Sequence, residues 1–379
     1  MKEQTSILLA FSWHDPRLFR GIGRYANEQG WHVSPHLFAS QFIPHGWSGD
    51  GAITSYGRGL GKFIRSLEMP KVDITVWEMD EPVPRVVVDN QAVGRLAARH
   101  FLERGFKHFA YYTWSAINVN RIRRLAFFSA LEDEGVGPDS IFEIRQPPNT
   151  VLPDWERYQE AILSQVNRLP RPVAVFTGQE NLAAILIDAC VRNGIHIPEE
   201  IAVLGVDNIE FLCECIEVPL SSIDTQLEVV GYRAAQQLDR LMRGEITREE
   251  PPVLIAPKGI VNRQSTDVLA VSHPAVVEAL QFIKRSFANA ITLDDIGAHV
   301  GMSKRGMEKA FLKHLNRSPS AELRRVRLDH AKRMLTGTNE KVETVARECG
   351  YSNSSNLSFA FNKDTGMSPR MYRKTFTKT

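Results

Sequence analysis

The sequence predicts two architectures in one chain of 379 residues: an α/β body, and after it an all-α domain with two helix-turn-helix units. Three observations lead to this prediction. Strand, helix and glycine stop follow one another repeatedly up to about residue 262, which is typical of parallel sheets covered by helices. No strand pattern remains beyond His273-Pro274. Within this last part, one helical unit occurs twice.

The strand and helix cycles of the body can be followed along the chain. Residues 7–11 form a short apolar run that predicts a buried strand, and a helix is expected from Arg17 to about Gln29. Val86-Val87-Val88 is β-branched and continuous, as expected of a strand covered on both faces. The later elements are a helix capped by Asp89-Asn90 and ended by Gly105, a strand from Phe109, helices over 123–134 and 180–193, and a strand over 201–206.

Polar residues follow the ends of several predicted strands. Asp89, Trp114 and Asp207-Asn208 each come directly after such a strand. Ligands of open parallel sheets bind at the carboxyl ends of the strands. These positions are therefore the first candidates for a binding site in the body.

The α/β pattern ends around residues 245–272. Residues 249–252 and 257–259 are loop-like, and Ser265-Thr266-Asp267 leads into a linker. We therefore expect a body over residues 1–265, a linker over 266–275 and a helical domain over 276–379.

The helical domain contains an internal duplication. Residues 295–303 match residues 344–352 at an offset of 49, and matches at an offset of 50 follow, Met307 and Phe311 with Leu357 and Phe361 among them. Each copy is a short helix, a turn entered through glycine, and a second helix with apolar residues four apart, which is the pattern of a helix-turn-helix. Between the copies, Ser318-Pro319 opens a helix of about 16 residues, roughly 24 Å long. This length is compatible with two second helices placed about 34 Å apart, one turn of DNA.

Charge is distributed unevenly between the two parts. The net charge is only +2, but residues 273–379 carry 19 Lys and Arg against 10 Asp and Glu, while the rest carries 27 against 34. A basic domain on an acidic body is typical of a protein of which one part meets a polyanion; a merely solvated basic face is the alternative.

Several function classes are excluded by missing patterns. The cysteines, which are Cys190, Cys213, Cys215 and Cys349, have no zinc-binding spacing, so neither a metal nor a cofactor is expected. The first apolar run is too short for a signal peptide, and no run of about 18 apolar residues exists, so we expect a cytoplasmic protein without a membrane partner. The glycine-rich segment 57–62 is not a P-loop, and no GxSxG or HExxH occurs, so no enzyme activity is expected.

The helical domain resembles the AraC-type DNA-binding domain over about Ala275–Lys374. Gly366-Met367-Ser368-Pro369-Arg370-Met371-Tyr372-Arg373 carries the resemblance most specifically. The resemblance implies that 303–315 and about 354–365 are the helices in the major groove. The base contacts that it implies are Ser303, Lys304, Arg305, Glu308 and Lys309 in the first unit, and Ser354, Ser355, Ser358 and Phe359 in the second.

The chemistry of the two implied contact sets differs. Arg305 or Lys304 can donate to guanine, and Glu308 can accept from the cytosine amino group. Lys309 and Phe359 stand where the family often has arginine, and Phe359 offers only an apolar contact with a thymine methyl. We infer that the second unit is the weaker or more shape-dependent reader.

The body resembles the effector domain of LacI/GalR-type repressors, which is related to periplasmic sugar-binding proteins. Residues 88–105, 195–208 and 219–223 carry this resemblance. It implies two doubly wound lobes that close on a small sugar, with ligand contacts from Asp89, Trp114, Arg123 and Asp207. The alternatives are a helix cap for Asp89, a surface residue for Arg123 and core packing for Trp114. Thr177-Gly178-Gln179-Glu180 departs from the Asn-Asp pair that the family often has, and the segment 13–16 is a further candidate for the pocket.

A sugar sensor in front of AraC-type units is the layout of the xylose-operon regulators, and the whole chain resembles that group. We therefore expect a sugar-responsive, DNA-binding transcription regulator, an activator of a pentose (xylose-like) operon. The expected partners are duplex operator DNA, a pentose effector, a second copy of the chain in a homodimer, and RNA polymerase. The alternative is a cytoplasmic sugar-binding protein or an α/β enzyme whose C-terminal helices serve protein interaction.

Overall fold

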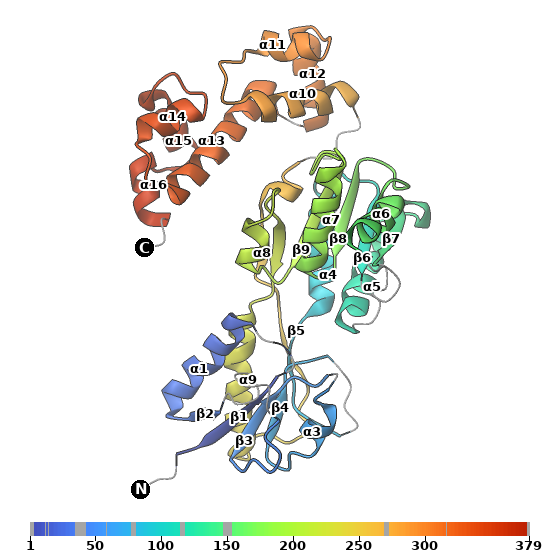
Figure 1. The fold of residues 1–379 in the computed structure, drawn as a ribbon, viewed down its shortest axis with the longest axis vertical. Helices are drawn as coiled ribbons and strands as arrows, with labels where there is room; N and C mark the ends of the chain where they lie inside the picture. The colour runs from blue at the N-terminus through green and yellow to red at the C-terminus, as the bar shows by residue number, and fades with distance from the viewer. Residues whose placement is uncertain are drawn as a thin grey trace. The chain divides into compact units, whose positions relative to one another are not determined.

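The computed structural model describes residues 4–11, 13, 15–34, 43–57, 59–76, 81–113, 118–146, 154–268, 273–315 and 317–376. The chain divides into two compact units, Met1–Val268 and Leu269–Thr379 (Figure 1). The first unit is α/β and the second is entirely helical in its described residues, so the predicted fold class is confirmed. Among the described residues, no helix combines the length and apolar character that a membrane crossing requires.

The first lobe of the α/β unit is built on a parallel sheet of order β2-β1-β3-β4, beside a parallel pair of β5 and β11. Leu9 and Val72 face a core with α1 and α9, while Leu8 faces a second core with α3, so helices cover both faces. The elements of this lobe are β1 (Ser6–Ala10), α1 (Pro16–Gln29), β2 (His32–Ser34), β3 (Gly51–Thr54), α3 (Gly61–Arg65), β4 (Lys71–Asp73), β5 (Val86–Val88), α9 (Leu227–Met242) and β11 (Val253–Ile255).

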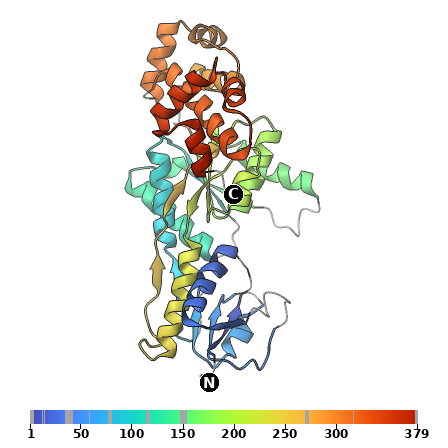
Figure 2. The same cartoon turned by 90° about the vertical axis from the view of Figure 1, so that its left-hand side faces the viewer.

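Helices α1 and α9 lie side by side although two hundred residues separate them in the sequence (Figures 1 and 2). A Cβ at Gly21 would lie 2.0 Å from the carbonyl oxygen of Glu228, and a Cβ at Gly231 would lie 2.1 Å from that of Leu18. The two helices can approach this closely only because both positions are glycine. This contact attaches the late helix α9 to the first lobe.

The second lobe holds a six-stranded sheet of order β12-β10-β9-β8-β6-β7, parallel except for β12. Its aromatic centre contains Tyr111, Phe127 and Phe176, which are fully buried. The elements are α4 (Asn90–Leu102), β6 (Phe109–Thr113), α5 (Asn118–Asp133), the 3-10 turn η1 (Pro138–Ser140), β7 (Ile141–Arg145), α6 (Trp155–Val166), β8 (Val173–Thr177), α7 (Glu180–Arg192), β9 (Ile201–Val206), α8 (Glu210–Glu214), β10 (Ser221–Asp224), β12 (Gly259–Val261) and the 3-10 turn η2 (Gln264–Thr266).

The helical unit has two small cores that share one long helix. Leu323 of α13 packs in the core of the first helix-turn-helix unit, and Leu328, Ala331 and Leu335 pack in the core of the second. The helices are α10 (Pro274–Ser286), α11 (Leu293–His299), α12 (Lys304–Leu315), α13 (Pro319–Gly337), α14 (Val342–Glu348), α15 (Ser354–Thr365) and α16 (Pro369–Phe376). Helix α13 therefore connects the two units rigidly, as one continuous element.

Two predicted boundaries can be compared with the structure. Helix α5 begins at Asn118, five residues before the predicted start at Arg123, because its first turns bury polar rather than apolar side chains. Within the predicted linker 266–275, Thr266 is buried in the α/β unit, and its hydroxyl forms a hydrogen bond with His100 Nε2 at 3.0 Å. Pro274, near the end of the predicted linker, already begins α10. The residues between 269 and 272 lie outside the described part.

Candidate DNA-binding surface and effector site

The first helix-turn-helix unit consists of α11, a glycine turn and α12. Thr292 and Asp295 form a reciprocal capping box at the start of α11. Gly301 has a φ of +65°, and the turn brings the Met302 amide 2.9 Å from the Gly297 carbonyl oxygen. A Cβ at Gly297 would lie 2.8 Å from the Met302 carbonyl oxygen, so this crossing also requires glycine.

Most of the side chains that the sequence implicates in base contacts are exposed on α12 or at its start. Met307, Ala310, Phe311 and Leu315 hold the helix in its core. The exposed predicted contacts are Ser303, Lys304, Arg305 and Lys309, and Glu308 is half-buried beside them. The Ser303 hydroxyl accepts from the Gly306 amide at 3.2 Å, so Ser303 acts as a cap of the helix. Lys304, Arg305 and Lys309 have no ion-pair partner in the described part of the chain, and three such cations on one helix face suit a groove between phosphates.

The second unit repeats this geometry with other chemistry. Gly350 has a φ of +74°, and Asn353 caps α15 by accepting from the Asn356 amide at 2.9 Å. Leu357 and Phe361 are buried. The predicted contacts differ in exposure: Ser355 and Phe359 are exposed, Phe359 at 75%, whereas Ser354 and Ser358 are half-buried.

Arg327 on α13 links the two units. Its guanidinium donates from Nε to the Phe287 carbonyl oxygen at 2.9 Å and from Nη2 to that of Asn289 at 2.8 Å. The same guanidinium lies over the Tyr351 ring at 5.9 Å. Because Phe287 belongs to the first unit and Tyr351 to the turn of the second, these contacts fix the angle between the units.

In the α/β unit, the structure brings Arg123 and Asp207 together. Arg123 is only 4% exposed, and its guanidinium donates to Asn90 Oδ1 at 2.7 Å, to the Gly178 carbonyl oxygen at 2.9 Å and to Asp207 Oδ1 at 3.3 Å. The alternative of a surface residue is therefore wrong for Arg123. Asp89 is half-buried one residue before Asn90, and its carboxylate caps α4 by accepting from the Ala92 amide at 2.8 Å. Trp114 lies outside the described residues.

Asp207 occupies a backbone conformation that side chains rarely adopt. Its φ is +99° and that of Asn208 is +53°, at the carboxyl end of β9. Thr225 donates to Asp207 Oδ1 at 3.0 Å. Arg17 of the first lobe donates to the carbonyl oxygens of Asp207 and Asn208 at 2.6 and 2.8 Å. Strain of this kind persists where the surroundings hold it and is concentrated at functional sites.

Within the candidate segment 13–16, one residue supports the hydrogen bonds from Arg17 to the Asp207–Asn208 turn. Asp15 caps α1 and pairs with Arg17, with its Oδ2 2.8 Å from Arg17 Nη2. Trp13 is exposed, and His14 lies outside the described residues. Asp15 therefore orients the arginine that connects the two lobes.

Sequence reasoning missed Asn120 and Glu180. Asn120 is 1% exposed, one turn before Arg123, and neither atom of its side-chain amide has a partner in the described residues. Glu180 is 2% exposed and accepts from the Ile209 amide at 3.1 Å and from Ser222, beneath the strained turn. Burial, and after it the negative charge of Asp207, raise the pKa of the Glu180 carboxyl to about 7. The departure at 177–180 was the signal that could have identified Glu180.

Two family models match the chain. A periplasmic binding protein-like domain matches residues 98–266, and a helix-turn-helix domain matches residues 296–375. The xylose operon regulatory protein of Escherichia coli K12 is 25% identical over 97% of this chain and 96% of its own length. Along nearly its whole length, the chain is therefore similar to a two-domain transcription regulator. Both resemblances seen in the sequence are thereby confirmed.

Two further comparisons extend over most of the chain. The xylose operon regulatory protein of Haemophilus influenzae is 26% identical over 76% of this chain and 74% of its own length. A solved xylose-binding transcription activator covers 100% of both chains at 24% identity with a TM-score of 0.79, which shows a common fold. These relatives are transcription regulators rather than enzymes, which agrees with the expectation that this chain has no enzyme activity.

Proposed function

We propose that this regulator senses a pentose, xylose in the first place, and activates a catabolic operon by binding its operator through α12 and α15. The observation that carries the proposal is the union, in one chain, of two features: buried Arg123 paired with Asp207 at the end of β9, and a face of α12 whose cations have no ion-pair partner among the described residues. Relatives that match nearly the full length are named for the xylose operon, which supports the choice of sugar.

The polar groups around Arg123 have the chemistry of a sugar site. Carboxylates such as Asp89 and Asp207 accept hydrogen bonds from vicinal hydroxyls. Arg123 and the Asn120 amide, which has no partner among the described residues, can donate to hydroxyl and ring oxygens. An aromatic face for the C–H side of the sugar is the role that we propose for Trp114. The sugar then shifts the regulator between two states by binding one of them more tightly, with a coupling of about 1–3 kcal/mol.

Several partners complete the proposal. The regulator acts in the cytoplasm as a homodimer, so that two copies of the helical unit meet one operator, and it recruits RNA polymerase there. The DNA contacts that we propose are Ser303, Lys304, Arg305, Glu308 and Lys309 on the first unit, and Ser354, Ser355, Ser358 and Phe359 on the second.

The test uses the full chain. Calorimetric titration with D-xylose, D-ribose and L-arabinose measures sugar binding, and fluorescence anisotropy with a duplex selected from a random library measures DNA binding with and without each sugar. Xylose should bind and change duplex affinity about 5- to 150-fold, as expected for a coupling of this size. Asp207→Asn should abolish the heat of xylose binding in the calorimetric titration. Asp133 is an exposed carboxylate on α5, and Asp133→Asn should leave the heat of xylose binding unchanged. Absence of heat and of any change in duplex affinity with all three sugars would contradict the sensing role.

A further inference from the structure

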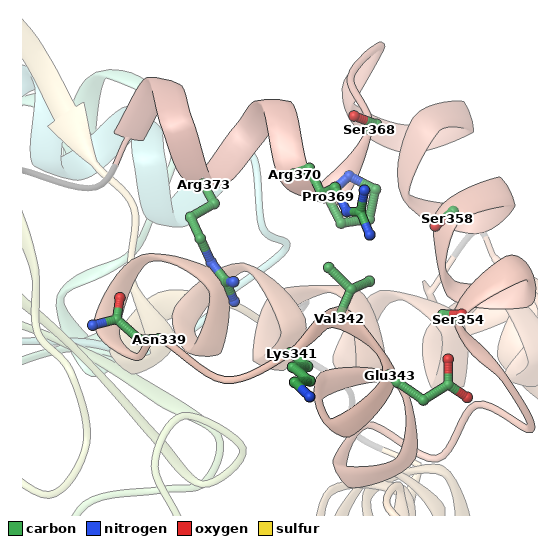
Figure 3. A pocket seen from close by; sticks show the side chains of 10 residues that line it. All are labelled: Asn339, Lys341, Val342, Glu343, Ser354, Ser358, Ser368, Pro369, Arg370 and Arg373. Atoms are coloured by element: carbon green, nitrogen blue, oxygen red, sulfur yellow. The ribbon is translucent and has the colours of Figure 1, made fainter.

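An open hollow of about 690 Å³ lies on the second helix-turn-helix unit, where α14, α15 and α16 converge (Figure 3). Its walls carry three cationic side chains, one carboxylate and two hydroxyls from α15. Figure 3 shows Ser354 and Ser358 on one side, one turn apart on α15, and Arg370 and Arg373 along α16. The polar residues described in this way are Lys341, Glu343, Ser354, Ser358, Arg370 and Arg373.

The three cationic side chains, Lys341, Arg370 and Arg373, differ in their contacts. Arg373 donates to the carbonyl oxygens of Leu335 and Glu340 at 3.0 and 2.6 Å, so it holds the end of α13 and the loop before α14. Lys341 and Arg370 are exposed, and neither has a hydrogen-bond or ion-pair partner in the described part of the chain. Arg373 thus positions the loop that carries Lys341, while Lys341 and Arg370 remain available for an anion.

The Ser354 and Ser358 hydroxyls are also available for a ligand. Ser354 and Ser358 have no hydrogen-bond partner among the described residues, although both are half-buried in the wall of the hollow. Asn353, rather than Ser354, caps α15. Hydroxyl donors and cations that line one hollow are the groups with which proteins contact the DNA backbone.

We infer that the hollow receives a backbone phosphate of the operator, held by Lys341 and Arg370 and hydrogen-bonded by Ser354 and Ser358. The inference rests on the proposed DNA-binding function and assigns the second unit a different task from the first. Ser354 and Ser358, which the family resemblance implies as base contacts, then position the backbone and carry no sequence information. Ser355 and Phe359, on the exposed side of α15, remain for the groove.

The test measures the salt dependence and the sequence preference of the full chain separately. The probes are the library-selected duplex, its single-base variants and a random-sequence duplex of the same length. Lys341→Ala combined with Arg370→Ala should weaken binding to all of them by a similar factor, roughly tenfold at 0.1 M salt, and lower the slope of log K against log salt by about 1. Ser354→Ala with Ser358→Ala should weaken all probes about threefold and leave the order of the base variants unchanged.

A matched control removes a charge from the same unit outside the hollow. Lys363 is exposed in the last turn of α15, and Lys363→Ala should leave the salt slope unchanged. An unchanged slope in the double variant would overturn the inference, as would a loss confined to particular base variants. Lost transcription activation with intact duplex binding would also overturn it, since that result indicates an acidic protein segment in the hollow. If the wild-type chain prefers no duplex, the proposed function itself fails, which is a different outcome.

Discussion

The two helix-turn-helix units share a backbone and differ in surface chemistry. At an offset of 50 residues, Lys304, Arg305, Glu308 and Lys309 of α12 correspond to Ser354, Ser355, Ser358 and Phe359 of α15. These four charged positions of the first helix are thus uncharged in the second, while the buried positions, such as Phe311 and Phe361, are retained. The comparison teaches that the fold of such a unit is specified by its buried residues and its glycine turn, and that its role in binding is set independently by the exposed face.

The first prediction tests the comparison at the turn glycines, where we expect the largest change in unfolding free energy. Gly301 and Gly350 both have positive φ, so alanine is strained at either, at about 1 kcal/mol. A Cβ at Gly350 would also lie 2.3 Å from the Phe287 carbonyl oxygen, whereas a Cβ at Gly301 meets open space. Gly350→Ala should therefore destabilise the chain by about 3 kcal/mol and Gly301→Ala by about 1 kcal/mol, measured by urea unfolding. Equal losses would show that the two turns are not packed differently.

The second prediction concerns the angle between the units. Arg327→Met keeps the aliphatic stem but removes both donors to the Phe287 and Asn289 carbonyl oxygens. The expected loss of unfolding free energy is about 2 kcal/mol, because two acceptors lose a charged donor. Binding to the selected duplex should fall more than binding to a duplex that contains only the part contacted by the first unit. Arg324→Met, on an exposed position of the same helix, is the control.

The third prediction exchanges corresponding positions of the two recognition helices. Arg305→Ser should cost roughly tenfold in affinity for the selected duplex, about 1.4 kcal/mol, and relax the preference at one base pair. Ser355→Arg, the reverse change on α15, should raise the affinity for duplexes with guanine at a new position. Both are read from binding to a library of duplexes. A uniform loss across all sequences for Arg305→Ser would assign Arg305 to the phosphate backbone.

The smallest effect is expected at Phe359, which is 75% exposed. Phe359→Ala should change the unfolding free energy by less than about 0.5 kcal/mol, since the ring packs against little. It should reduce affinity only for duplexes with thymine under α15, by about threefold, because the contact is apolar. A large loss of stability would instead place the ring in the core of the second unit.

Particular residues show how far the sequence could lead. The strands β1, β5 and β9, the caps Asp89 and Ser318 and the helix ends at glycine were predictable, because each depends on residues within one element. The start of α5 was not, because polar residues dominate Asn118–Ile122 and the burial of Asn120 arises only from the fold around Arg123. Glu180 and Asn120 were also missed, since burial of a polar side chain beside a site is a property of packing.

The amino-acid sequence by itself determined the order of the two architectures, the duplicated unit and the residues offered by each recognition helix, because periodicity, caps and turns are local. Only the tertiary structure decided that Arg123 meets Asp207, that Arg17 of one lobe holds the strained turn of the other, and that Lys341 and Arg370 border one hollow. These contacts join residues up to 190 positions apart in the chain, and such distances close only when the cores between them have packed.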